Sequence, residues 1–184
     1  MTVNHVIFQT PFGSAAMVYT CAPFQLQKVY LPRQSNTDLI QDIEQDFLIS
    51  QNGYHSHIDV LIKRLQHYFC GHPITTPWKW LSWQKRTPLQ IKTLKETALI
   101  PFGEVCSYQQ LAKKIGRPKA TRFVGSCMAR NPFPIFIPCH RVIRSDGTLG
   151  CFGGGSELKQ TLLNLESNET ISDRSNPTGR LSHN

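Results

Sequence analysis

Two helix-start signatures stand close together in the chain, and they narrow the folds that this stretch can adopt. Thr87-Pro88-Leu89-Gln90 combines an N-cap threonine, a proline at the first helical position and a glutamine that closes a capping box. Ser107-Tyr108-Gln109-Gln110 is a second capping box, and Gly116 suits the end of the helix that it begins. A further helix is expected from about Pro118. Two short helices joined by a glycine-containing turn predict a helix-turn-helix.

The expected third helix has one apolar face and one face of small side chains. At helical spacing the apolar face is formed by Ala120, Phe123, Val124 and Cys127. Arg122 points almost directly away from that face, with Gly125 and Ser126 beside it. A long cation among small neighbours suits close approach to a DNA groove, or the filling of a gap left by an extruded base. The alternative is an ordinary solvated arginine.

A thiol, an imidazole and a guanidinium follow one another in the run Ile137-Pro138-Cys139-His140-Arg141-Val142. The thiolate is the reactive form of cysteine, and nearby cationic or hydrogen-bonding groups control how much of it is present at neutral pH. The run therefore offers Cys139 as a nucleophile. Because side chains alternate along an extended segment, we expect His140 either to reach Cys139 only through a water molecule or to serve a different partner. A buried structural cysteine is the alternative, since free cysteine is often buried.

The first part of the chain is predicted to be a small α/β unit without catalytic residues. Its apolar patterns predict strands near Val6–Phe8, Ala15–Thr20 and Leu26–Leu31, and helices near Asp38–Phe47 and Ile58–Tyr68. The following segment, 70–86, is expected to be a connection that packs across this unit. It holds Trp78, Trp80 and Trp83, for which stacking on nucleic-acid bases is the alternative.

The fold class predicted from these patterns is α/β in the α+β sense. A small strand-rich N-terminal α/β domain is followed by a mostly helical C-terminal domain with a helix-turn-helix. The expected boundaries are 1–86 for the N-terminal domain with its linker and 87–166 for the C-terminal domain. The polar stretch 167–184 is expected to be a disordered tail.

Charge favours a polyanionic partner for the second part of the chain, within a formal net charge of +8. Residues 1–86 carry seven Lys and Arg against five Asp and Glu, whereas residues 87–166 carry eleven against five. Such a concentration of positive charge fits nucleic acid. A basic surface without such a partner explains it equally well.

Cysteine usage and hydropathy indicate a cytoplasmic protein with no membrane partner. Six cysteines stand at irregular spacings without a C-x-x-C pair, which favours reduced thiols over disulfides or a zinc site. No run of eighteen apolar residues predicts a membrane span. The first residues also lack a basic region followed by an apolar core.

The motifs from Thr87 to Glu166 resemble those of the O6-alkylguanine-DNA alkyltransferases, also called methylated-DNA protein-cysteine methyltransferases. The motifs that occur in the order and at the spacings of that family are Phe102-Gly103-Glu104-Val105, Ser107-Tyr108-Gln109-Gln110-Leu111-Ala112, Arg122-x-Val124-Gly125, Asn131-Pro132 and Ile137-Pro138-Cys139-His140-Arg141-Val142. The first 86 residues are similar only in their strand-rich outline and in the turn Thr10-Pro11-Phe12-Gly13.

The resemblance implies direct reversal of O6-methylguanine, and of O4-methylthymine, in double-stranded DNA. It implies that Cys139 takes the alkyl group irreversibly and is used once, with no cofactor. In this reading His140 is a base that acts through a water molecule, and Glu166 at a helix end orients the imidazole. Tyr108 would donate to the departing base or contact a phosphate. The alternative is a non-catalytic, alkyltransferase-like protein that binds alkylated DNA, although such relatives replace the cysteine.

The resemblance also implies the surroundings of the thiol. The implied DNA-binding residues are Arg122, which takes the place of the flipped nucleotide, with Tyr108, Ala120, Thr121, Gly125 and Ser126. The implied substrate pocket consists of Val142, Phe152, Gly153 and Gly154. Asn131 and Arg141 are expected to have structural roles.

Two departures from the family pattern bear on specificity and on metal. Phe152 stands where tyrosine is common and Gly153 where serine or alanine is common, which leaves the range of bulky O6 substituents open. No zinc is expected, because no cysteine precedes Cys21 and Leu26 stands near the position of a histidine ligand. The expected partner is duplex DNA that contains O6-alkylguanine, bound by a monomer.

Overall fold

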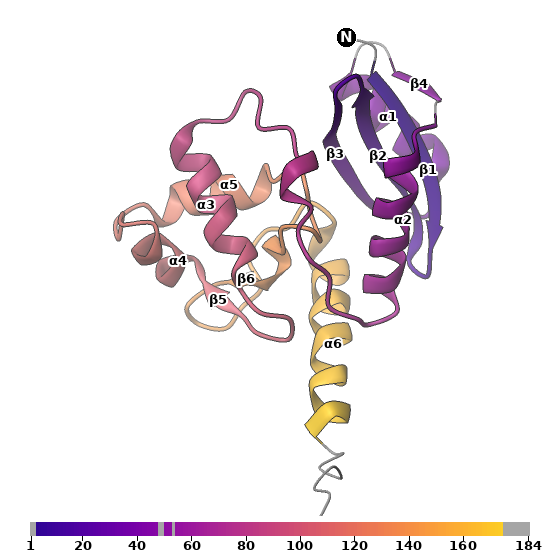
Figure 1. Ribbon diagram of the computed structural model, residues 1–184. Coiled ribbons are helices and arrows are strands. Elements are labelled where there is room, and N and C mark those ends of the chain that lie inside the picture. Colours follow the sequence, from indigo (N-terminus) through magenta and orange to yellow (C-terminus); the bar gives the residue numbers. More distant parts are fainter. Residues whose placement is uncertain (1–2, 48–49, 53, 175–184) are drawn as a thin grey trace, which may run out of the picture.

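The N-terminal part of the chain is a four-stranded sheet with helices packed on its two faces (Figure 1). The computed structural model describes residues 3–47, 50–52 and 54–174. The strands are β1 (Val3–Thr10), β2 (Gly13–Cys21), β3 (Phe24–Arg33) and β4 (Ser50–Asn52), in the spatial order β3-β2-β1-β4. β1, β2 and β3 pair antiparallel, whereas β4 pairs parallel with β1. The sequence predicted the strands β1, β2 and β3, without their pairing, and did not predict β4.

Side-chain alternation along β2 explains why helices cover both faces of the sheet. Alternate residues of β2 join the core beneath α2 (Ser56–Phe69), and the residues between them pack with α1 (Asn36–Asp46). The buried residues concerned are Ala15, Met17 and Tyr19 on the first face, and Ala16 and Val18 on the second. Since successive side chains of a strand point to opposite faces, an apolar run in a central strand needs cover on both. The two predicted helices supply that cover.

The second part of the chain is mostly helical, as predicted. Its helices are α3 (Pro88–Ala98), α4 (Tyr108–Lys114), α5 (Thr121–Ala129) and α6 (Gly155–Arg174), with the 3-10 helices η1 (Trp78–Trp80) and η2 (Cys139–Arg141). Both predicted capping boxes are present, at Thr87 and Ser107. The short strands β5 (Cys106–Ser107) and β6 (Val142–Ile143) pair in parallel, which joins the start of α4 to the end of η2.

α4 and α5 form the predicted helix-turn-helix. Gly116 has a φ of 77°, a left-handed conformation that follows the end of α4 and that glycine adopts without steric cost. α5 begins at Thr121 rather than near Pro118, because the residues before it form a turn. In that turn the Ala120 N–H donates to the Arg117 carbonyl oxygen at 2.8 Å.

One continuous apolar core joins the two parts of the chain. The tryptophan segment crosses between them, as expected. Trp80 packs edge-on against Phe24 of β3, and Trp83 packs edge-on against Phe133, which follows α5. The N-terminal sheet is therefore packed against the part that carries the Pro-Cys-His-Arg run.

α6 extends further than the sequence indicates. Glu166 lies within α6 and not at its end, because the helix continues to Arg174. The expectation of a disordered tail from residue 167 is therefore wrong for its first part, and residues 175–184 lie outside the described residues. The combination of sheet and helices confirms the predicted fold class. Within the described ranges, no helix is both long and apolar enough to cross a membrane.

Candidate active site around Cys139

Cys139 opens a short 3-10 helix rather than lying on an extended segment. The Arg141 N–H donates to the Pro138 carbonyl oxygen at 3.0 Å, which closes the turn of η2. The prediction of an extended Cys139-His140 segment is therefore wrong. In a turn of three residues per revolution, consecutive side chains point in three directions. Accordingly Cys139 lines a cavity, while His140 and Arg141 both bind Glu166.

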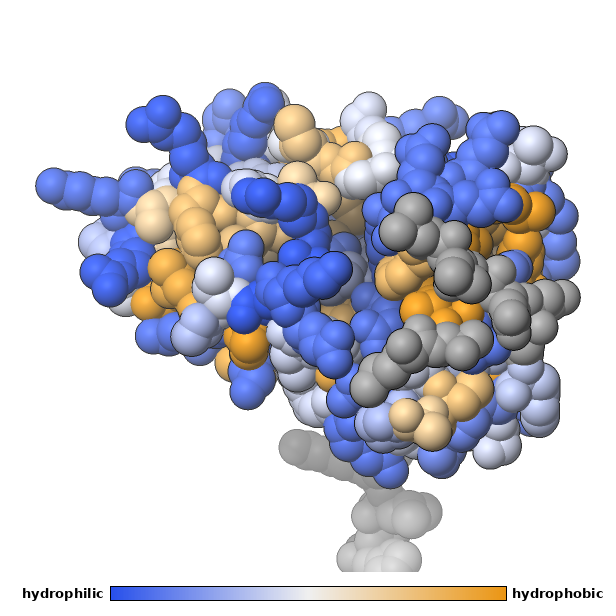
Figure 2. Space-filling model, turned by 90° about the horizontal axis from the view of Figure 1, so that it is seen from above, coloured by the Kyte–Doolittle hydropathy of each residue, from blue (hydrophilic) through white to orange (hydrophobic). Residues whose placement is uncertain are grey.

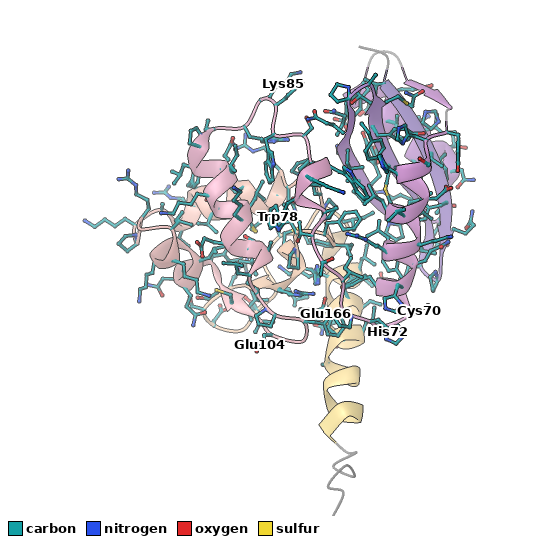
Figure 3. The ribbon with its side chains drawn as sticks, in the orientation of Figure 1. Cys70, His72, Trp78, Lys85, Glu104 and Glu166 are labelled. Atoms are coloured by element: carbon teal, nitrogen blue, oxygen red, sulfur yellow. The ribbon has the colours of Figure 1, made fainter. Side chains whose placement is uncertain are left out.

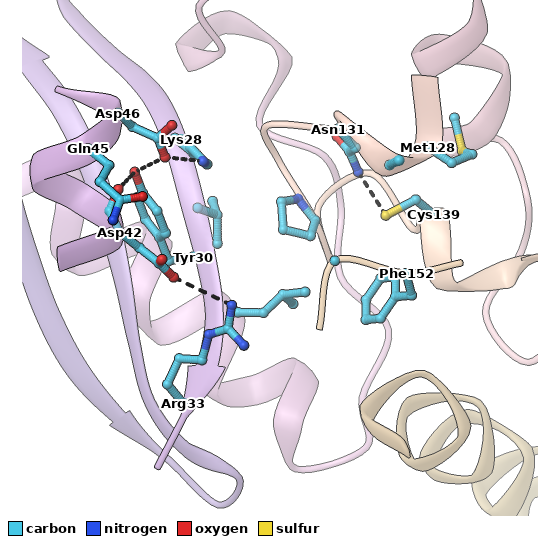
Figure 4. Close-up of a pocket in the computed structure, with 15 residues that line it drawn as sticks. Lys28, Tyr30, Arg33, Asp42, Gln45, Asp46, Met128, Asn131, Cys139 and Phe152 are labelled. Carbon is cyan, nitrogen blue, oxygen red and sulfur yellow. Dashed lines mark hydrogen bonds and ion pairs between the residues drawn. The ribbon is translucent and has the colours of Figure 1, made fainter. Parts of the chain in front are cut away.

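Asn131 holds both the thiol and the loop before it (Figure 4). Its side-chain N–H₂ group donates to Cys139 Sγ at 3.1 Å and to the Ile137 carbonyl oxygen at 2.8 Å. Its Oδ1 accepts from the Phe133 N–H at 3.0 Å. Asn131 thus binds the backbone of the loop and also contacts the candidate nucleophile directly.

The resting thiol is neutral. Burial raises the pKa of Cys139, and the hydrogen bond from Asn131 and the nearby charge of Lys159 only partly oppose this. The guanidinium of Arg141 is occupied elsewhere, since it donates to Glu166 and to the Ile100 carbonyl oxygen. A buried neutral thiol needs a base before it can attack.

His140 is placed to be that base. The imidazole is fully buried, and its Nε2 lies 2.7 Å from Glu166 Oε1. A carboxylate accepts only, so Nε2 carries the proton and Nδ1 carries the lone pair. Nδ1 is buried and has no hydrogen-bond partner among the described residues. Burial lowers the pKa of His140, so the ring is neutral near pH 7 and able to accept a proton at Nδ1.

Glu166 is a buried carboxylate that gathers hydrogen bonds from three segments of the chain. Its Oε2 accepts from Arg141 Nε at 2.8 Å and from the Gly103 N–H at 3.1 Å. Burial opposes ionisation, but the hydrogen bonds from His140 and Arg141 and the charge of Arg141 outweigh it and lower the pKa of Glu166 to about 2. The carboxylate is therefore ionised and able to orient the imidazole.

Tyr68 is a site residue that sequence reasoning missed. It lies on α2, in the part where no chemistry was predicted, and its buried hydroxyl donates to Glu166 Oε1 at 2.7 Å. The same hydroxyl lies 3.1 Å from His140 Nε2. The apolar stripe of α2 predicted a core tyrosine, and a buried phenol needs a polar partner. Nothing in the sequence indicates that the partner stands in α6.

Lys159 is a second residue that the sequence did not single out. It is fully buried on α6 and donates to the Val142 carbonyl oxygen at 2.6 Å and to the Leu149 carbonyl oxygen. Burial lowers the pKa of Lys159 to about 8. The sequence feature that could have indicated its burial is the position of this lysine between Leu158 and Leu162, in an apolar helical stripe. The side chain joins η2 and β6 to the loop that follows them.

A cavity of about 280 Å³ opens in front of Cys139 (Figure 4). On the side of the thiol it is lined by Met128, Asn131, Phe152 and Gly153, and on the opposite side by residues of β3 and α1, among them Lys28, Tyr30, Leu31, Arg33, Asp42 and Asp46. A Cβ added at Gly153 would meet no atom within 4 Å. The glycine therefore leaves open space beside the thiol.

Two residues expected in the pocket wall do not line this cavity. Val142 is fully buried in the core, where β6 pairs with β5. A Cβ added at Gly154 would come within 3.1 Å of both Leu158 and Leu31, so this glycine allows close packing of α6 against β3. Neither Val142 nor Gly154 contributes to the wall of this cavity, and their expected place in the substrate pocket stays a prediction.

Tyr108 begins α4 and reaches the glycine loop. Its hydroxyl donates to the Cys151 carbonyl oxygen at 3.4 Å, and burial raises its pKa. A Cβ at Gly150, where φ is 69°, would lie 2.8 Å from this hydroxyl. Gly150 is therefore required for the close approach of the loop to Tyr108.

The residues expected to contact DNA lie along α5 and just before it. Thr121 and Arg122 are exposed in its first turn, and Ala120, Gly125 and Ser126 are partly exposed. Ser126 also binds Arg130, whose Nε donates to the Ser126 carbonyl oxygen at 3.3 Å. No group of three or more His, Cys, Asp or Glu side chains suited to a metal occurs within the ranges described. The expected absence of zinc stays a prediction.

Comparison with known proteins supplies the family of the chain. Residues 88–168 match the family model described as 6-O-methylguanine DNA methyltransferase, DNA binding domain. This part of the chain belongs to the O6-methylguanine-DNA methyltransferase family. The match contains the helix-turn-helix together with Cys139, His140 and Glu166.

Relatives of this methyltransferase family resemble the chain mainly over its second part. The constitutive methylated-DNA protein-cysteine methyltransferase of Bacillus subtilis is 46% identical over 105 residues, which cover 56% of this chain and 62% of that protein. The rat methylated-DNA protein-cysteine methyltransferase is 59% identical over 66 residues, 35% of this chain and 32% of the relative. The chain thus matches less than two thirds of the length of either methyltransferase.

Solved methyltransferase structures resemble nearly the whole chain. Mycobacterium tuberculosis OGT in complex with DNA matches with a TM-score of 0.72 and 28% sequence identity. The match covers 90% of this chain and 93% of that one. The N-terminal sheet, whose sequence gave little indication of relatives, is therefore part of the likeness.

Proposed function

We propose that this protein repairs DNA by moving an alkyl group from O6 of guanine in duplex DNA to Cys139 Sγ. The arrangement that carries the proposal is a buried neutral thiol facing a cavity, followed by an imidazole whose lone pair on Nδ1 is unpartnered among the described residues. Glu166 holds the other ring nitrogen. Membership of the methyltransferase family gives this arrangement its substrate.

The first step is removal of the thiol proton. In the proposed reaction Cys139 gives its proton through a water molecule to Nδ1 of His140, which becomes an imidazolium bound to the Glu166 carboxylate. The thiolate attacks the carbon attached to O6, so that the S–C bond forms as the C–O bond breaks. The bonding electron pair leaves with the guanine, which must then be stabilised or protonated.

Tyr108 is proposed to assist the leaving base. Its hydroxyl stands at the start of α4 beside the glycine loop, where it donates only a long bond of 3.4 Å to the Cys151 carbonyl oxygen. Burial raises its pKa, so it remains a neutral donor near pH 7. A donor aimed at the base or at the phosphate of the flipped nucleotide strengthens as negative charge develops.

The helix-turn-helix is proposed to bring the duplex to the cavity. The target carbon is inside a duplex, so the nucleotide must rotate out of the stack at a cost of a few kcal/mol. Arg122, exposed in the first turn of α5, would take its place, and the small residues Ala120, Gly125 and Ser126 allow close approach. Thr121 adds a polar contact.

The product is a thioether, which is not hydrolysed, and so each molecule repairs one lesion. No cofactor is needed for this transfer. We extend the proposal to O4-methylthymine, which carries an alkyl group on an equivalent oxygen. We also propose that the protein acts as a monomer and in the cytoplasm.

Intact mass tests the proposal. The protein is incubated with a duplex that holds one O6-methylguanine, and the expected gain is one methyl group, located on the peptide with Cys139. Cys139→Ala should bind the duplex and gain nothing, whereas Cys151→Ser, which removes an exposed thiol of the nearby loop, should gain the methyl group normally. Binding without any gain in the wild type would instead favour the non-catalytic, alkyltransferase-like alternative.

A further inference from the structure

A second, larger cavity lies between the two parts of the molecule and shares Lys28, Asp46, Ala129 and Asn131 with the cavity in front of Cys139. It measures about 600 Å³ and begins where α5 ends, because Ala129 and Arg130 line it. Its other walls are the loop before α3, the interior of β3 at Gln27 and Lys28, and the ends of β1, β2 and α1. Figure 2 looks onto this side of the molecule and shows a hollow between the two halves with hydrophilic side chains around it.

Three of the four cations that line the groove have no acidic partner among the described residues. Lys28, Lys85, Arg86 and Arg130 line it, and Asp46 is its one acidic lining residue among those described. Asp46 is bound to Lys28 and, at 2.6 Å, to the hydroxyl of Tyr30. The other three cations form no ion pair with any described residue. The groove therefore carries an uncompensated positive charge.

Lys85 is exposed and has an unusual backbone conformation. Its φ is 60°, in the left-handed region that residues other than glycine rarely adopt. Figure 3 shows Lys85 at the tip of the loop that leads into α3. Such strain persists where the surrounding structure imposes it, and it gathers at functional positions. Arg86, whose N–H donates to the Trp83 carbonyl oxygen at 3.2 Å, continues the same turn.

The groove lies within reach of any duplex that α5 contacts. Arg122 and Arg130 are eight residues apart on one helical path, a separation of about 12 Å at about 1.5 Å per residue. A duplex carries about one phosphate charge for every 1.7 Å of its axis. A duplex that lies along α5 and extends past the end of the helix would bring its backbone to the groove, which begins at Ala129 and Arg130.

We infer that this groove binds the phosphate backbone of DNA beside the lesion, so that the N-terminal part of the chain extends the DNA-binding surface beyond the helix-turn-helix. The inference rests on the proposed function for its ligand. Lys85, Arg86 and Arg130 contact phosphates and carry no information on sequence. The Lys28–Asp46 pair and Asn131 line both cavities, which places the groove next to the site that receives the base.

The salt dependence of binding to an undamaged duplex tests this inference without any chemistry. The test variant is Lys85→Asn with Arg86→Gln, because asparagine tolerates the positive φ at position 85 while both charges are lost. Each phosphate contact contributes about 0.9 to the slope of log K against log salt. The double variant should lower the slope by about 1.8 and weaken binding several-fold near physiological salt.

A matched control separates this result from a general loss of charge. Lys63→Ala removes an exposed cation from α2, outside the groove, and should leave the slope unchanged. Arg130→Gln tests the third cation separately, since it also ends α5. If the double variant has the same slope as Lys63→Ala, the inference is overturned, even if methyl transfer is normal. If the slopes are as expected but the wild type transfers no methyl group, the result counts against the proposed function alone.

Discussion

At the residue scale, the proposed chemistry depends on which ring nitrogen of His140 carries the proton. His140 holds its proton on Nε2 toward Glu166 and keeps its lone pair on Nδ1, and it does so because the surrounding donors and acceptors are fixed. Asn131 positions the thiol and Tyr68 positions the carboxylate. The chemistry proposed for Cys139 therefore depends on groups from both parts of the chain.

Tyr68→Phe tests the role of the buried phenol with almost no change of shape. Loss of a donor to Glu166 concentrates negative charge on the carboxylate, which raises the pKa of His140. We expect transfer to slow by roughly tenfold, since a hydrogen bond to a charged group contributes about 1.5–3 kcal/mol. The acid limb of the rate–pH profile should also move to higher pH.

The control for Tyr68 is Tyr54→Phe, which removes an exposed hydroxyl that donates to Asp59 at 2.6 Å. This variant should leave the rate and the profile unchanged. A Tyr68→Phe profile that keeps its acid limb, with only a loss of thermal stability, would reduce Tyr68 to a core residue.

Gly153→Leu tests how the cavity sets substrate size. A Cβ at this position meets nothing within 4 Å, so the variant is expected to fold, and the longer side chain then occupies the space beside Cys139. Transfer of methyl should change less than twofold, while transfer of benzyl from O6-benzylguanine should slow by more than tenfold. Gly153→Ala is the matched control. Equal slowing for both groups would show that the substituent lies elsewhere.

At the scale of elements, α6 connects the catalytic turn to the rest of the fold. Glu166 on α6 binds residues of η2 and α2 and the backbone of Gly103, and Lys159 on the same helix binds two backbone carbonyls. Both side chains are buried within α6, beside the apolar Leu158, Leu162 and Leu165 of the same helix. The position of η2 is therefore sensitive to the protonation of Glu166.

Acid unfolding should report this connection. The pKa of Glu166 is lowered from 4.5 to about 2 on folding, so its stabilising effect is complete above pH 4.5 and is lost as pH falls toward 2. The loss amounts to about 3 kcal/mol at about 1.36 kcal/mol per pKa unit. Folding also lowers the pKa of His140. The stability that the neutral imidazole contributes is therefore likewise lost as pH falls below the ordinary pKa of histidine.

The comparison is made by denaturant unfolding of the wild type and of Glu166→Gln at a series of pH values. The variant should be less stable at neutral pH, because Arg141 loses its charged partner in a buried position. Its stability should fall less between pH 5 and pH 2 than that of the wild type. Parallel curves for the two proteins would contradict the assignment of a buried, ionised Glu166.

Elements fixed by local signals could be predicted from the sequence, and those fixed by distant contacts could not. The capping boxes at Thr87 and Ser107 placed two helix starts, because an N-cap acts through its own neighbours. η2 was predicted as extended, because the Asn131 side chain that binds the Ile137 carbonyl oxygen and Cys139 Sγ lies outside the segment. Tyr68 and Lys159 were missed for a related reason. Their partners lie far away in the sequence, and only the fold brings them together.

At the scale of the whole molecule, the two parts share one core. Residues beneath the N-terminal sheet and residues of α3, α4, α5 and α6 belong to a single apolar cluster. The N-terminal part also contributes Tyr68 to the site and one wall to each of the two cavities. We therefore expect one cooperative unfolding transition for the described chain.

Leu65→Ala tests this shared core. Leu65 is buried on α2, and its truncation should cost about 2–5 kcal/mol. Hydrogen exchange should accelerate in α3 and α6 as well as in the sheet. Val60→Ala, on the exposed side of the same helix, should change stability by less than about 1 kcal/mol. Faster exchange confined to the N-terminal part would mean that the two parts unfold separately.

The central claim is that Cys139 is a single-use acceptor activated by His140 and Glu166. The most direct measurement is the number of labelled methyl groups transferred per protein molecule from excess duplex with methyl-labelled O6-methylguanine. The account predicts a plateau at one methyl group per molecule, all of it on the Cys139 peptide, with a slower approach to the same plateau in Glu166→Gln. A plateau above one, or label released into solution, would contradict it.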